Sequence, residues 1–80
     1  MPAELHISSL LIHARPAAIA SARSAIAALD GVEVHGANPQ GKIVVTLETR
    51  DEDEIVAAMD ALQRMTGVVS VALVYHQTEA

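Results

Sequence analysis

The sequence repeats itself at a spacing of 36 residues, and this repeat constrains the fold more than any other feature. Shifting the chain by 36 places similar residues on each other at eight positions: Ile7 on Ile43, Leu11 on Leu47, Ile19 on Ile55, Ala22 on Ala58, Ile26 on Leu62, Leu29 on Met65, Gly31 on Gly67 and Val32 on Val68. Repeats at a fixed period indicate copies of one structural unit. We therefore expect two similar halves.

Each half reads as strand, helix, strand. In the first half, residues 5–13 (LHISSLLIH) predict a strand, and Pro16 suits the first turn of a helix, where its missing N–H is not needed. Gly31 predicts the end of that helix, because a left-handed residue commonly follows a helix C-terminus. A short strand at 32–35 and a turn at 37–41 follow.

The second half has the clearer helix. After a strand at 42–48, Asp51 is a candidate N-cap, and Glu54 three residues later completes a pattern typical of a capping box. Apolar residues at helical spacing predict its buried side, namely Ile55, Ala58, Met59, Leu62 and Met65. Gly67 predicts its end, residues 68–75 predict the last strand, and the polar tail 77–80 is expected to fray.

The order β-α-β-β-α-β predicts an α+β fold of the ferredoxin-like, split β-α-β type. Right-handed crossovers place both helices on one face of a four-stranded antiparallel sheet, with the strands in the order 4-1-3-2. The length of 80 residues fits a single ferredoxin-like domain over residues 1–80, with an ordered core at about residues 4–76.

Charge and composition exclude several classes of function. The formal charge of −5 argues against nucleic acid as a partner, because Lys and Arg drive that binding. Cysteine is absent, which excludes disulfides and zinc–thiolate sites. The first residues lack a basic secretion signal, and no stretch approaches the length of a membrane span, so we expect a cytoplasmic protein.

The predicted fold leaves one face of the sheet without helices. Strand alternation predicts that Ile7, Ser9, Leu11, Ile43, Val45, Leu47, Val71 and Leu73 point toward the helices. The open face then carries His6, Ser8, Leu10, Ile12, Glu33, His35, Val44, Thr46, Glu48, Ser70, Ala72, Val74 and His76. An apolar patch left open usually marks a contact surface. A dimer interface on this face, or strand addition at the edge of the second strand, is the alternative.

No set of residues supports catalysis or a cofactor. His6, His76 and Glu48 can approach one another on adjacent strands, but no histidine pair has helical spacing, so we expect no metal site. Phe and Trp are absent, which removes the stacking residues of an RNA-binding sheet. We therefore expect a binding protein and not an enzyme.

The first and last strands resemble a known family. Residues 8–15 (SSLLIHAR) and 67–77 (GVVSVALVYHQ) are similar to NapD, the chaperone family of the periplasmic nitrate reductase, as are the segments 31–34 and 41–48. The resemblance covers nearly the whole chain. It implies a cytoplasmic chaperone that binds the twin-arginine signal peptide of the reductase catalytic subunit. Binding would hold back Tat export until the molybdenum cofactor is inserted.

The resemblance implies that the peptide binds as a helix on the open sheet face. The candidate peptide-binding residues are Ser8, Leu10, Ile12, Val44, Thr46, Glu48, Ala72, Val74 and His76. On this assignment Leu10→Asp abolishes binding without unfolding the domain. We expect a monomer, with a weak dimer as the alternative. The alternatives are an ACT-like regulatory domain that binds a small molecule, or a dimerisation domain.

Overall fold

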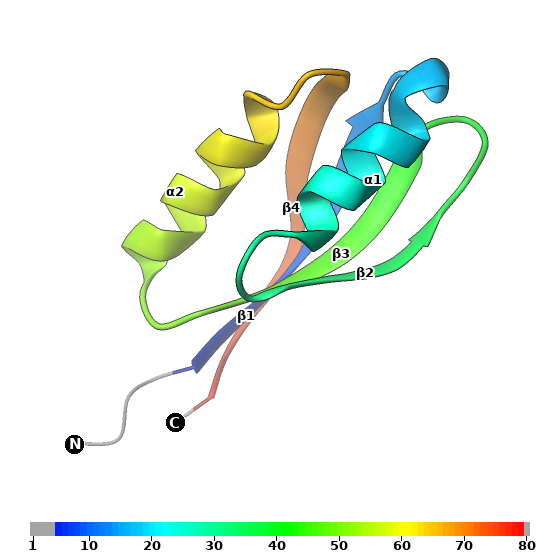
Figure 1. Ribbon diagram of the computed structural model, residues 1–80. Helices are drawn as coiled ribbons and strands as arrows, with labels where there is room; N and C mark the ends of the chain where they lie inside the picture. The colour runs from blue at the N-terminus through cyan, green and yellow to red at the C-terminus, as the bar shows by residue number, and fades with distance from the viewer. Residues whose placement is uncertain (1–4, 80) are drawn as a thin grey trace.

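The computed structural model describes residues 5–79 and contains the predicted order of elements. The strands are β1 (Leu5–Ala14), β2 (Val32–Ala37), β3 (Lys42–Thr49) and β4 (Val68–Glu79), and the helices are α1 (Ile19–Ala27) and α2 (Glu52–Gln63), with a 3-10 turn at Pro16–Ala18 before α1. All strand pairs are antiparallel and the order is β2-β3-β1-β4, which confirms the predicted topology. Both helices cover the same face of the sheet (Figure 1). Among the described residues, no helix has the length and hydropathy needed to cross a membrane.

Helix α2 begins as predicted. The Asp51 side chain accepts a hydrogen bond from the Glu54 N–H at 2.8 Å, and the Glu54 carboxylate accepts one from the Arg50 N–H at 2.8 Å. The first bond satisfies a backbone donor that the helix leaves free in its first turn, and the second joins the residue before the cap to the same turn. The acids Glu52 and Asp53 add a favourable interaction with the helix dipole.

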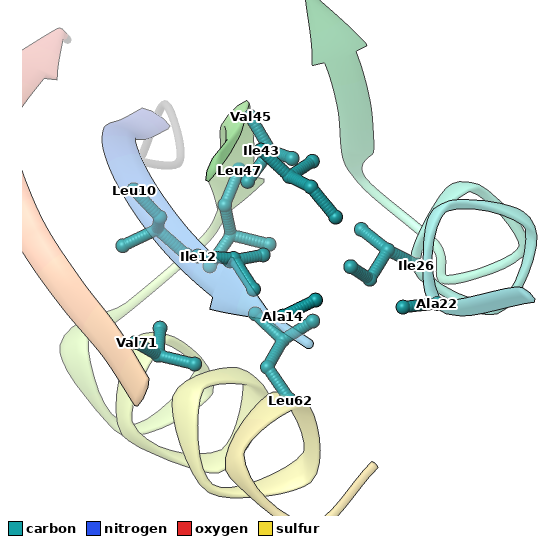
Figure 2. Close-up of a cluster of buried hydrophobic side chains, with 10 residues drawn as sticks. All are labelled: Leu10, Ile12, Ala14, Ala22, Ile26, Ile43, Val45, Leu47, Leu62 and Val71. Atoms are coloured by element: carbon teal, nitrogen blue, oxygen red, sulfur yellow. The ribbon is translucent and has the colours of Figure 1, made fainter. Parts of the chain in front are cut away.

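The core lies between the sheet and the two helices. Figure 2 shows its side chains converging from β1, β3, β4, α1 and α2: Leu10, Ile12, Ala14, Ala22, Ile26, Ile43, Val45, Leu47, Leu62 and Val71. Most of these side chains are less than 3% exposed, as expected for close packing of aliphatic groups. We call the side of the sheet that meets them the helix face, and the opposite side the open face.

The turn between β2 and β3 depends on glycine. Gly41 has φ +102°, a conformation that L side chains rarely adopt, and its carbonyl accepts a 2.7 Å hydrogen bond from the Ala14 N–H. A Cβ at this position would collide with the Ala14 carbonyl oxygen. The close approach joins the turn to the end of β1.

Strand β4 is longer than predicted. It continues to Glu79, within the segment that was expected to fray, and Glu79 pairs with Leu5. The prediction was wrong because β1 offers backbone partners over its whole length, so the polar tail still completes a ladder. Strand pairing thus extends beyond residue 76, where the predicted ordered core ends, and the first residue of that core, 4, lies outside the described residues.

Candidate functional site

The open face of the sheet is the candidate functional site. The pairing registers place side chains from all four strands on it. They are Ile7, Ser9, Leu11 and His13 from β1; Val44, Thr46 and Glu48 from β3; Glu33 and His35 from β2; and Ser70, Ala72, Tyr75 and Gln77 from β4. These side chains are assigned to one face because residues that pair across neighbouring strands point to the same side of the sheet.

The predicted orientation of β1 was wrong. Leu10 and Ile12 are 1% and 0% exposed and belong to the core, and Ser8 is buried on the same side. Ile7, Ser9 and Leu11, which were predicted to face the helices, lie on the open face instead. Leu10→Asp would therefore bury a charge in the core and unfold the domain, rather than abolish binding selectively.

The error comes from a one-residue difference between the two halves. Core residues of the two helices are 36 positions apart, as in Ile26 and Leu62, whereas core residues of β1 and β3 are separated by odd numbers, as in Leu10 and Val45. A shift of one residue moves every strand side chain to the other face.

The assignment of β4 was right at its start and wrong at its end. Ser70 and Ala72 lie on the open face, paired with His13 and Leu11. A register shift between Ser9 and Leu10 then leaves Val74 without a partner on β1, so alternation does not assign it to a face.

After this bulge, His76 lies on the helix face beside Ser8. It meets the buried His6: their ring nitrogens Nδ1 and Nε2 are 2.9 Å apart, and the rings stack with centroids 5.1 Å apart. Glu48 lies on the opposite face, so the three predicted metal neighbours do not converge. No group of three potential metal ligands occurs within the described residues.

The centre of the open face is apolar. Leu11 on β1 pairs with Val44 on β3 and with Ala72 on β4, which makes a row across three strands. Val44 is 47% exposed, and Tyr75 at 56% extends the apolar area along β4. Leu11 is only partly buried although no helix covers it. Exposed aliphatic groups in a continuous row favour a protein partner.

The two ends of the open face differ in charge. Glu48 pairs with Ile7, and Glu33 pairs with Thr46, so both acids lie toward the start of β1. Lys42 pairs with His13 at the other end. Between them, the His35 ring nitrogen and the Thr46 hydroxyl form a 2.7 Å hydrogen bond. The face therefore suits an elongated ligand with one basic end and an apolar middle.

Together, the fold and this surface define a small α+β domain in which both helices cover one face of a four-stranded antiparallel sheet and leave the other face open. The NapD protein family matches residues 5–80 of the chain. The chain belongs to the NapD family.

Characterised relatives agree with this assignment. Chaperone NapD of Escherichia coli K12 is 30% identical over 74 residues, which cover 91% of this chain and 85% of the relative. Chaperone NapD of Paracoccus pantotrophus is 43% identical over 74 residues, or 91% of this chain and 64% of the relative. The solution structure of the Escherichia coli Tat proofreading chaperone protein NapD superimposes with a TM-score of 0.84 at 29% identity, covering 94% of this chain and 80% of that chain. The chain is thus a chaperone of this family and not an enzyme.

Proposed function

We propose that the protein binds, in the cytoplasm, the twin-arginine signal peptide of the periplasmic nitrate reductase catalytic subunit. Binding holds back Tat export until the molybdenum cofactor is inserted. The family assignment and the Tat proofreading role of the solved relative support this proposal. The observation that carries it is the open face, which combines an apolar row with acids at one end. The family assignment leaves the ACT-like alternative without support.

The apolar stretch of the peptide would lie over Leu11, Val44 and Ala72, flanked by Ile7 and Tyr75. Burial of apolar area contributes roughly 25 cal/mol per Å², less the cost of ordering the peptide. The small side chain of Ala72 lets a peptide helix approach closely. This contact would supply most of the affinity.

The arginines of the peptide would lie beside Glu48 and Glu33, two exposed acids. An exposed ion pair contributes on the order of 0–1 kcal/mol, so these acids would orient the peptide more than they hold it. Complementary charge also accelerates encounter. Of the nine predicted residues, Val44, Thr46, Glu48 and Ala72 remain in the proposed site. Ser8, Leu10, Ile12 and His76 do not, and Val74 is not assigned to a face.

Calorimetric titration with the signal peptide tests the function, and two matched variants test the face. Val44→Asp places a charge in the apolar row, whereas Val56→Asp makes the same change at a 67% exposed position of α2. We expect Val44→Asp to weaken binding about tenfold or more, equivalent to about 1.4 kcal/mol, and Val56→Asp to change it less than about twofold.

Thermal unfolding of both variants shows whether the fold persists. Unchanged binding by folded Val44→Asp would overturn the choice of face. Absence of binding by the unaltered protein at high peptide concentration would overturn the function itself.

A further inference from the structure

A pair of histidines joins the end of β4 to the start of β1. There the two strands continue side by side past the helices (Figure 1). His6 of β1 is 5% exposed, and its Nδ1 lies 2.9 Å from Nε2 of His76 on β4. The hydroxyl of Thr78 lies 3.4 Å from the same Nδ1. Two side chains near the end of β4 therefore attach to one buried ring.

The last residues of β4 gain little from apolar burial. We call residues 75–79, which follow the β-bulge, the terminal segment of β4. Before the bulge, Val71 belongs to the core, and α2 packs on the strand. From residue 72 to residue 78, by contrast, every side chain is exposed. Polar contacts with β1, including the histidine pair, therefore contribute most to holding the terminal segment in place.

The two histidine rings share one hydrogen between their facing nitrogens. The rings are parallel within 2°, and their centroid separation of 5.1 Å exceeds the nitrogen separation by about two ring radii. The nitrogens therefore point at each other, as in an N–H···N hydrogen bond. One ring must donate and the other must accept, since a neutral imidazole has one nitrogen of each kind.

This bond can accept one additional proton but not two. The first proton converts the donor ring to an imidazolium, and its bond to the neutral ring becomes charge-assisted. A second proton places a hydrogen on both facing nitrogens, so no acceptor remains and two positive rings face each other. Because His76 is exposed, water can deliver that proton.

The charged groups that face the pair come from the start of α2. A pocket of about 370 Å³ beside His6 is lined by four of them: Arg50, Asp51, Glu52 and Asp53. Three carboxylates against one guanidinium favour a single positive charge on the pair. The strand neighbours Thr49 and Ser8, which pair with His6 and His76, are uncharged. None of these groups restores the acceptor that the second proton removes.

We propose that the His6–His76 pair is a pH-sensitive clamp, which holds the terminal segment of β4 on β1 near neutral pH and releases it when both rings are protonated. Histidine ordinarily changes charge between about pH 5 and 8. Tyr75 and Gln77 of this segment lie on the open face, so release removes them from the edge of the apolar row. Acidification should therefore weaken peptide binding, a consequence that rests on the proposed function.

Amide hydrogen exchange measures the clamp without any ligand. The open form binds one proton more than the closed form, so the ratio of open to closed molecules should rise by up to tenfold per unit of pH below about pH 6. Protection, corrected for the pH dependence of unprotected exchange, should fall for terminal-segment amides that bond to β1. It should stay constant for the amides of β4 that precede the bulge.

Two matched variants separate the clamp from general effects of pH. His76→Gln keeps a side chain that donates and accepts hydrogen bonds but takes up no proton, so the terminal segment should lose most of its pH dependence. His13→Gln removes an exposed histidine at the other end of β1 and should retain that dependence. An equal pH dependence in His76→Gln, or none in the unaltered protein, would overturn the clamp.

Calorimetric titration with the signal peptide tests the link to the open face. Between about pH 7.5 and about pH 5.5, the affinity of the unaltered protein should fall several-fold, and that of His76→Gln less than about twofold. An equal fall in both proteins, or none in either, would overturn the link. Absence of binding at both pH values would overturn the proposed function, whereas hydrogen exchange would still decide whether the clamp exists.

Discussion

At the scale of single residues, the neighbours Leu10 and Leu11 have different roles: Leu10 contributes to stability and Leu11 to the proposed binding face. Leu10 is enclosed by the core, so Leu10→Ala should lower the free energy of unfolding by about 2–5 kcal/mol. Leu11 is partly exposed on the open face, so Leu11→Ala should cost roughly 1 kcal/mol or less in stability and mainly weaken binding of the signal peptide. Urea unfolding and peptide titration of both variants measure these effects. Similar losses of stability in the two would contradict the assignment of faces.

The local sequence of β1 does not reveal this difference. Aliphatic residues occupy both sides of the strand: Leu10 and Ile12 on one, Ile7 and Leu11 on the other. The polar residues mislead, because His6 and Ser8 are buried on the helix face at the end of the sheet. Residue polarity predicted β3 correctly, because its core residues alternate with positions that are mostly polar: Lys42, Thr46 and Glu48. Polarity carries no such information in β1.

At the scale of elements, the side chain of Asp51 caps the N-terminus of α2. Asp51→Ala removes the acceptor of the Glu54 N–H and should lower stability by about 1 kcal/mol. Asp53→Ala, in the first turn of the same helix, removes an acid that makes only a dipole interaction and should cost about 0.3–1 kcal/mol. Chemical unfolding compares the two. An equal or smaller effect of Asp51→Ala would show that the cap contributes nothing beyond its charge.

Features with local chemical signals could be predicted from the sequence. The β-bulge, which depends on how β1 and β4 pair, could not. The Asp51 cap, the Pro16 start of the first helical segment and the glycine at the turn before β3 each follow from the conformations that those residues favour. The bulge at Val74 has no such signal, since the segment is uniformly apolar around it. That bulge moves His76 to the helix face. The prediction of His76 as a peptide-binding residue was wrong for this reason, and only the pairing with β1 shows it.

At the scale of the whole molecule, the direction of the bound peptide follows from the arrangement of charge. Glu33 and Glu48 mark one end of the open face and Lys42 the other, with the apolar row between them. In a signal peptide the basic segment precedes the apolar one. The arginines should therefore lie at the acidic end, and the peptide should run in the direction of β1.

A nitroxide label at either end of the signal peptide measures that direction by NMR. A label near the arginines should broaden the amide signals of Ile7 and Glu48, and one at the far end those of His13 and Ser70. Lys42→Glu gives both ends of the face an acid, and should make the two patterns less distinct. Added salt should act in the same sense, because exposed charges are screened over about 10 Å at 0.1 M. The reverse pattern of broadening would show that the apolar row, and not the acids, determines the direction in which the peptide lies.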